Sequence, residues 1–174
     1  MILTSLRAFS QESEIKTDLR FGMGFTLLGS GDMISTTIEN ELNFKMGRFI
    51  ASSLSISYGR SNFGVNETTS FLQGNTNFYI SPFNNTRKND FRIGTGLTYY
   101  HVSDAYLSGQ WYENGVIVDE DYEFRKRKSL GFNMIIENTF SISNELLLGI
   151  KLYSQPYFNG DINSGFLLKL GVKL

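Results

Sequence analysis

Polar and apolar residues alternate with a period of two through most of this chain. The pattern is clearest at the end, where one face holds Phe166, Leu168, Leu170, Val172 and Leu174 and the other holds Leu167, Lys169, Gly171 and Lys173. Because successive side chains of a strand point to opposite sides, this alternation indicates a β-strand. Its recurrence along the chain predicts eight strands, over residues 18–27, 33–46, 50–59, 70–80, 91–100, 129–140, 146–153 and 166–174.

The segments between these strands carry turn signals. Short turns are expected at residues 29–32, 47–48 and 143–144, longer loops at 60–69 and 81–90, and a last loop at 158–161. Residues 103–127 form the longest stretch without the alternation. Within it, Asn114 and Gly115 supply the positive φ angles of a two-residue hairpin turn. The fifth and sixth strands are therefore predicted to continue outward as a two-stranded ribbon.

Period alone does not say which face of the strands meets water. A soluble lipid-binding barrel would turn its apolar faces inward. Here the polar faces consist mainly of Gly, Ser, Thr and Asn, which suit the narrow interior of an eight-stranded barrel better than a water-facing surface rich in Lys and Glu. Most of the strands also have at least the roughly 9–11 residues that cross a bilayer at a tilt. The prediction is an all-β fold, a transmembrane antiparallel up-and-down β-barrel of eight strands with apolar faces toward lipid.

Composition narrows the function further. Charged residues make up 19% of the chain, below the roughly 25% of an ordinary soluble domain. The net charge of −1 gives no reason to expect nucleic acid as a partner. The chain has no cysteine, which excludes disulfides and cysteine-based metal sites. The Gly-x-Gly sequence at residues 22–24 lies inside a predicted strand and not at the start of a helix, so no phosphate-binding loop is indicated and no cofactor is expected.

The strand pattern and the closing segment 166–174 resemble the small eight-stranded outer-membrane β-barrels of Gram-negative bacteria, the OmpA-barrel, OmpX and OmpW-like group. The resemblance covers residues 18–174. It implies a bacterial outer-membrane location with both termini periplasmic, contact with outer-membrane lipids and lipopolysaccharide, and recognition of the last strand by the barrel-insertion machinery. Other outer-membrane or periplasmic proteins are further candidate partners, in a larger complex. Residues 1–17 are interpreted as a disordered leader or as the remnant of a secretory signal.

Several charged residues lie on the inward faces of the predicted strands: Arg20, Glu39, Glu41, Arg92, Glu137, Lys151 and Lys169. Because an unpaired buried charge costs several kcal/mol, these side chains are expected to form ion pairs. Adjacent strands suggest Arg20 with Glu39 or Glu41, and Arg92 or Lys151 with Glu137. Such a network predicts a polar lumen filled by side chains, and the alternative is a narrow channel for small solutes.

The stretch 103–127 and the residue that follows it combine aromatic and basic side chains. Trp111 and Tyr112 come before a basic run, which comprises Arg125, Lys126, Arg127 and Lys128. Aromatic and basic groups close together bind a partner protein or lipopolysaccharide phosphates, and they also anchor proteins at lipid headgroups. We therefore expect a structural, partner-binding or complex-forming membrane protein.

An enzymatic alternative depends on the only histidine. His101-Val102-Ser103 resembles part of the His-x-Ser-Asn motif of outer-membrane lipid A 3-O-deacylases. That resemblance implies His101 as base and Ser103 as nucleophile, with Glu113 as the one nearby glutamate to orient the histidine. Asp104 replaces the asparagine of the motif, and the motif lies further from the C-terminus than in that family.

Overall fold

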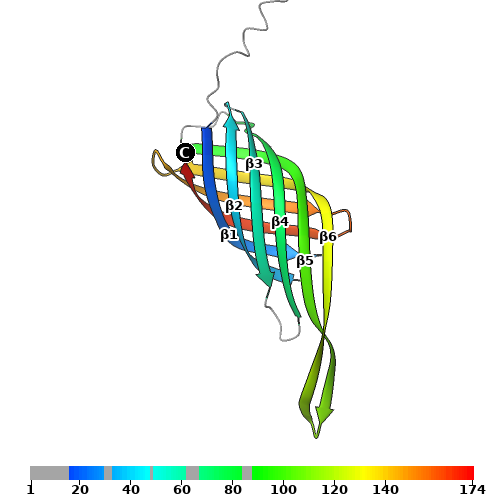
Figure 1. Ribbon diagram of the computed structural model, residues 1–174. Coiled ribbons are helices and arrows are strands. Elements are labelled where there is room, and N and C mark those ends of the chain that lie inside the picture. Colours follow the sequence, from blue (N-terminus) through cyan, green and yellow to red (C-terminus); the bar gives the residue numbers. More distant parts are fainter. Residues whose placement is uncertain (1–15, 30–32, 48, 62–66, 84–87) are drawn as a thin grey trace, which may run out of the picture.

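The computed structural model describes residues 16–29, 33–47, 49–61, 67–83 and 88–174. Within them, eight antiparallel strands form a closed barrel in which each strand pairs with the next along the chain and β8 pairs with β1 (Figure 1). The strands are β1 (Lys16–Leu28), β2 (Met33–Met46), β3 (Ile50–Ser61), β4 (Glu67–Ile80), β5 (Asn89–Glu113), β6 (Val116–Ser141), β7 (Leu146–Pro156) and β8 (Ile162–Lys173). The predicted fold class, topology and strand number are confirmed.

Several boundaries differ from the prediction. β3 continues to Ser61 and β4 begins at Glu67, so parts of the expected loop 60–69 are strand. The reason is that the ladder extends outward on both sides of the loop: Ser61 pairs with Thr69, and Glu67 pairs with Tyr106. The expected loop 81–90 likewise loses its last two residues to β5. The predicted leader lies outside the described residues except at its end, where β1 already starts at residue 16.

Apolar side chains cover the outside of the barrel. Leu168 and Leu170 are 53% and 55% exposed, whereas their neighbours Leu167 and Lys169 are 0% and 1% exposed. The same alternation of exposed and buried positions runs through β1, β2, β3, β4 and β7. The predicted orientation, with apolar faces outward and polar faces inward, is therefore confirmed. Among the described residues, no helix has the length and apolar character needed to cross a membrane.

Small residues let the walls of the barrel approach closely. A Cβ atom added at Gly24 would lie 1.9 Å from the carbonyl oxygen of Phe166 on the neighbouring strand β8. At Gly96 it would lie 2.1 Å from the carbonyl oxygen of Thr76 on β4. No side chain fits at these distances, so glycine at both positions is a requirement of the fold and not only a filler of space.

β5 and β6 extend far beyond the other strands and form the outer ribbon, residues 107–129 (Figure 1). β4 accompanies β5 only as far as Tyr106, and β7 pairs with β6 only from Met134 onward, with one further bridge between Gly131 and Tyr157 just beyond β7. The ribbon turns at Asn114 and Gly115, whose φ angles are 52° and 79°. The predicted hairpin and the predicted ribbon are both confirmed.

Candidate functional sites in the lumen and on the outer ribbon

Glu137 on β6 is the centre of an ion network in the lumen. Its buried carboxylate accepts hydrogen bonds from the guanidinium of Arg20 and, at 2.7 Å, from that of Arg92. Arg92 also donates to Asn43 Oδ1 at 2.7 Å, and its guanidinium carbon lies 4.0 Å from the ring centre of Tyr79. β1, β2, β4, β5 and β6 therefore all contribute to one polar contact region at the end of the barrel that holds the C-terminus (Figure 1).

Two lysines complete this lumen ion network. Lys151 Nζ donates to both carboxylate oxygens of Glu39, at 3.0 and 2.9 Å. Lys169 Nζ lies 2.9 Å from Glu39, contacts Glu41, and lies 3.4 Å from Glu137. Because each carboxylate meets at least one cation, the charges are desolvated without being left unpaired.

The pairing differs in part from the one expected. Arg20 does not pair with Glu39 or Glu41 on the adjacent strand but with Glu137 across the lumen, and with Asp18 at 2.5 Å on its own strand. That prediction was wrong, because a long side chain in a narrow barrel reaches the opposite wall as easily as its neighbour. Arg92 pairs with Glu137 as expected, while Lys151 pairs with Glu39 instead.

Among the described residues the network balances positive and negative groups. Four cations meet four carboxylates: Arg20, Arg92, Lys151 and Lys169 against Asp18, Glu39, Glu41 and Glu137. Asp18 was not among the residues predicted for this network, and neither was Tyr79, whose hydroxyl donates to Glu41 Oε1 at 2.9 Å. Their position in the alternation was the available signal, since both share a face with inward residues of their strands.

A layer of amide side chains lies next along the lumen. Asn133 Nδ2 donates to Asn77 Oδ1 at 2.6 Å, and Gln73 Nε2 donates to Asn75 Oδ1 at 2.9 Å. Tyr157 donates its hydroxyl to Gln73 Oε1 at 2.9 Å. The interior is thus occupied by hydrogen-bonded side chains well beyond the ion network, as expected for the small diameter of eight strands.

At the ribbon end of the lumen, Arg127 joins two carboxylates, Asp104 on β5 and Asp161 in the turn between β7 and β8. Its guanidinium donates to Asp104 Oδ2 at 2.9 Å and to Asp161 Oδ2 at 2.9 Å. Asp161 also accepts a hydrogen bond from Tyr100. Arg127 therefore closes the rim of the barrel, and only the other three members of the basic run remain without an ion-pair partner among the described residues.

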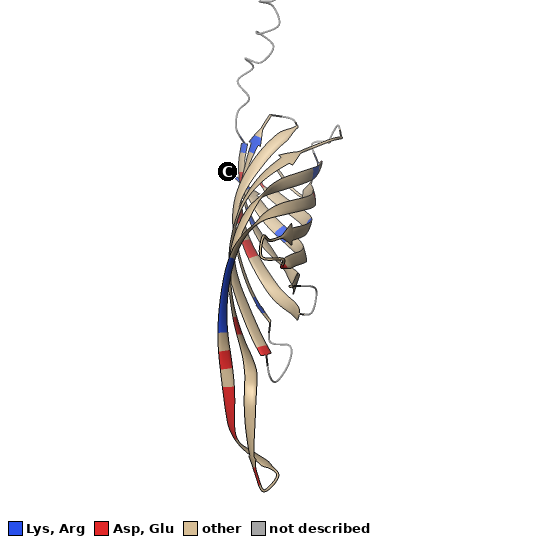
Figure 2. Ribbon diagram, turned by 90° about the vertical axis from the view of Figure 1, so that its right-hand side faces the viewer, with Lys and Arg blue, Asp and Glu red and all other residues tan. Residues whose placement is uncertain are grey.

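Charged residues follow a definite order along the outer ribbon. Moving from the barrel toward the tip, β6 passes from the basic run through an acidic segment (Asp119, Glu120, Asp121 and Glu123), as Figure 2 shows. Trp111 pairs with Asp119, six residues from Arg125, or about 20 Å along a strand. The aromatic and basic groups expected to lie close together are thus separated by acidic residues. Tyr122 donates its hydroxyl to Glu120 at 2.9 Å, which raises the pKa of that phenol.

A second basic group faces outward at the base of the outer ribbon. The outer basic belt consists of Arg60, His101, Lys126 and Lys128, which are neighbours through the strand register. Arg60 pairs with Ser70, and Ser70 pairs with Ser103 opposite Lys126. Apolar outward residues adjoin the belt on its barrel side, since Leu72 pairs with His101 and Tyr99 lies two residues before His101 on the same face of β5.

The three residues of the enzymatic hypothesis do not come together. His101 and Ser103 share the outward face of β5, but Glu113 lies at the tip of the ribbon, where it pairs with Val116. Twelve residues of extended strand separate Glu113 from His101, which is about 40 Å. A glutamate at that distance cannot orient the histidine, so the expected catalytic set is not formed.

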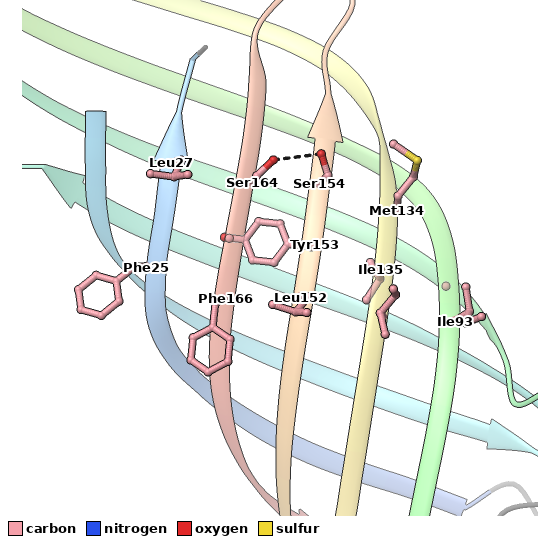
Figure 3. Close-up of a pocket in the computed structure, with 13 residues that line it drawn as sticks. Phe25, Leu27, Ile93, Met134, Ile135, Leu152, Tyr153, Ser154, Ser164 and Phe166 are labelled. Atoms are coloured by element: carbon pink, nitrogen blue, oxygen red, sulfur yellow. Dashed lines mark hydrogen bonds between the residues drawn. The ribbon is translucent and has the colours of Figure 1, made fainter. Parts of the chain in front are cut away.

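A shallow depression of about 800 Å³ runs across the wall formed by β1, β8, β7, β6 and β5 (Figure 3). Apolar side chains such as Phe25, Leu152 and Phe166 line it. The hydroxyls of Ser154 and Ser164 hydrogen-bond to each other at 3.1 Å there, so neither polar group is left without a partner on an apolar surface. Its lining is that of a surface in contact with lipid chains.

Known structures share this architecture, although the sequence is not close to them. No protein-family model matches the sequence, and no curated protein matches it. The chain is similar to a major outer membrane protein from Thermus thermophilus (11% identity, TM-score 0.70, covering 92% of this chain and 100% of that one). It is also similar to Ail, the attachment invasion locus protein of Yersinia pestis (8%, 0.64, 92% and 99%), and to the N-terminal β-barrel domain of Pseudomonas aeruginosa OprF (7%, 0.56, 92% and 100%).

The chain therefore has the fold of the small eight-stranded outer-membrane β-barrels, and the resemblance inferred from its strand pattern is confirmed at the level of the fold. Its apolar outer surface means that membrane lipid is the natural surrounding of the barrel wall.

Proposed function

We propose that this chain is an integral outer-membrane protein that does not conduct solutes and that presents the outer ribbon to a partner outside the cell. The ribbon is the observation that carries the proposal. It extends beyond every other strand and exposes large apolar groups, among them Trp111 (52%), Tyr112 (63%) and Phe124 (72%). Exposed aromatic groups on an ordered two-stranded scaffold are typical of binding surfaces.

The proposed orientation places both ends of the barrel chain in the periplasm and the ribbon outside. Two of the connections at the end nearest the C-terminus are short, between β2 and β3 and between β6 and β7. Short turns on the periplasmic side and larger extensions on the outer side are the usual arrangement in such barrels.

Single cysteines test the orientation cleanly, because the natural chain has none. Tyr112→Cys lies at the ribbon tip and Lys16→Cys at the opposite end. A membrane-impermeant maleimide should label Tyr112→Cys in intact cells and Lys16→Cys only after permeabilisation. The reverse result would overturn the proposed orientation.

The proposed absence of conduction is supported by the lumen ion network and the amide layer. Charged groups that hold each other at 2.7–3.0 Å leave little room for a hydrated ion to pass between them. In a planar lipid bilayer the refolded protein should show no stepwise conductance. Regular single-channel steps from the purified protein would favour the narrow-channel alternative instead.

A second candidate function, recognition of anionic lipid headgroups, is favoured by the outer basic belt. Its cations face outward at the edge of the apolar surface, where lipopolysaccharide phosphates lie in an outer membrane. Ail of Yersinia pestis has been crystallised with a heparin analogue, sucrose octasulfate, which makes that compound a suitable polyanion probe.

The belt can be tested without altering the lumen. Arg60→Gln together with Lys126→Gln should weaken binding of sucrose octasulfate and of lipopolysaccharide-containing nanodiscs several-fold. A matched pair on the opposite rim, Lys16→Gln with Lys173→Gln, should leave both unchanged. Equal affinity of the two double variants would contradict headgroup recognition by the belt.

A further inference from the structure

β6 has a long edge that no strand in the described part of the chain covers. On the side away from β5, the described part of the chain first meets β6 at Leu130, whose carbonyl accepts from the amide of Phe158 at 2.9 Å. From Ser129 outward to Val116 no strand of the described chain pairs with this side. Backbone groups alternate in direction along an antiparallel strand. Like those of Leu130, the backbone groups of Lys128, Lys126, Phe124 and Tyr122 therefore point to the open edge, which is a template for another strand.

The order of charges along this open edge is complementary to the same edge of a second copy that runs in the opposite direction. Acidic residues lie on the tip side of Phe124 and basic residues on the barrel side. When two copies of the edge run antiparallel with Phe124 opposite Phe124, opposite charges face each other in two kinds of pair, each of which occurs twice. These pairs are Glu123 with Arg125 and Glu120 with Lys128. Asp121 falls opposite Arg127, whose guanidinium already binds Asp104 and Asp161 of its own chain.

Other registers of the two edges place like charges opposite each other. Directly opposite residues of an antiparallel pair must share a face, so only shifts that keep like faces together are allowed. Centring the pair on residue 123 would place Glu123 against Glu123, and centring it on residue 125 would place Arg125 against Arg125. A parallel, in-register pair would set every acidic residue against its own copy. The register centred on Phe124 places no like charges opposite each other.

We propose that the open edge of β6 pairs with the same edge of a second copy, antiparallel and with Phe124 on the two-fold axis, and that the two barrels lie in opposed membranes. The result is a four-stranded sheet made of two β5–β6 ribbons. Because the two ribbons run in opposite directions, their barrels leave the sheet at opposite ends. This inference rests on the proposed function, in which the ribbon extends outside the cell, and it names the partner as a second copy of this chain.

A single junction of this kind is weak. Its ion pairs are exposed, and exposed ion pairs contribute little individually and are screened by salt. Two membranes that each carry many copies form many junctions at once, and the effective concentration of each new pair strengthens the contact. The pairing should therefore join membrane surfaces firmly at low salt and release them at high salt.

Two reversed-charge variants test the proposal. Glu120→Lys with Glu123→Lys makes the edge basic, and Arg125→Glu with Lys128→Glu makes it acidic. In the register centred on Phe124, each variant meets like charges in its own copies and opposite charges in the other variant. The matched control is Glu67→Lys with Glu113→Lys, which changes the same charge outside the paired segment.

The measurement uses phospholipid vesicles that each carry many barrels with the ribbon outward, and light scattering follows the clustering of the vesicles. Wild-type and control vesicles should cluster, and each reversed-charge variant alone should cluster at least tenfold less. An equimolar mixture of the two variants should recover pairing, and 1 M salt should abolish it. Barrel folding of every variant is verified by its mobility on unheated gels.

Three results would overturn the self-pairing: wild-type vesicles that stay dispersed, reversed-charge variants that cluster like the wild type, or a mixture that does not recover. Pairing of two copies only within one vesicle, detected by cross-linking, would overturn the opposed-membrane geometry. None of these results bears on the cysteine-labelling test of orientation, so failure of the self-pairing and failure of the proposed function are distinguishable.

Discussion

Removal of the charge at Glu137 should destabilise the barrel more than any other single neutralisation in the lumen. Its carboxylate is fully buried and accepts from Arg20 and Arg92, with Lys169 at 3.4 Å. Breaking a buried ion pair from one side costs about 3–5 kcal/mol, because the remaining charge is left without compensation. Arg20 keeps Asp18 as a partner, which places the expected loss for Glu137→Gln near the lower end, about 3 kcal/mol.

The assay is urea unfolding of the barrel refolded in lipid vesicles, followed by gel mobility and by circular dichroism. Fluorescence is unsuitable, since the only tryptophan, Trp111, lies on the ribbon outside the barrel. The control is Asp90→Asn, which removes the partner of Lys45 in a pair that is 35% and 20% exposed and should cost at most about 1 kcal/mol. A loss for Glu137→Gln no larger than that of the control would refute the reasoning.

Other variants test the remaining arguments. Leu168→Arg places a charge on the lipid face and should lower the free energy of unfolding by about 2–4 kcal/mol in the same urea assay; an unchanged value would mean that this face does not meet hydrocarbon. Gly24→Ala, whose methyl group would collide with the Phe166 carbonyl, should prevent barrel closure, seen as loss of the folded band on unheated gels. Gly115→Ala forces alanine to a φ of 79° and should cost about 1–2 kcal/mol of ribbon order, seen as faster amide exchange in the ribbon with the barrel unaffected. Ser103→Ala should leave lipid A acyl chains unaltered by mass spectrometry, and a changed acyl profile would revive the hydrolase hypothesis.

Much of the architecture could be predicted because the alternation of side chains is a local property. Each strand shows its own two faces, and their composition of Gly, Ser, Thr and Asn against Leu, Ile and Phe was enough to decide which face meets lipid. The ribbon could also be predicted from the sequence, because Asn114 and Gly115 form a turn that depends only on backbone conformation. The ends of the strands were harder to predict, since the outward extension of β3 and β4 depends on pairing between the two strands and on neighbours such as Tyr106.

Candidate sites were predicted less completely. The alternation correctly placed Arg20 and Glu137 on inward faces, but it contains no information on how far across the lumen a side chain reaches. Arg127 belongs to a basic run in the sequence, yet its partners Asp104 and Asp161 come from two other parts of the chain. Trp111 and the basic run are close in the sequence but lie about 20 Å apart along the ribbon, because an extended strand gains about 3.3 Å with every residue.

The sequence by itself determined that this chain forms strands, which side of each strand is apolar, and where the longest hairpin turns. Those properties depend on residues two or fewer positions apart. The tertiary structure alone decided which buried charges neutralise each other and which strand edge is left open. Both outcomes depend on closure of the barrel, which brings Arg20 of β1 to Glu137 of β6 and ends the pairing of β7 with β6 at Met134, beyond which Phe158 makes the contact with Leu130. Residues more than a hundred positions apart meet there for a geometric reason that no local pattern contains.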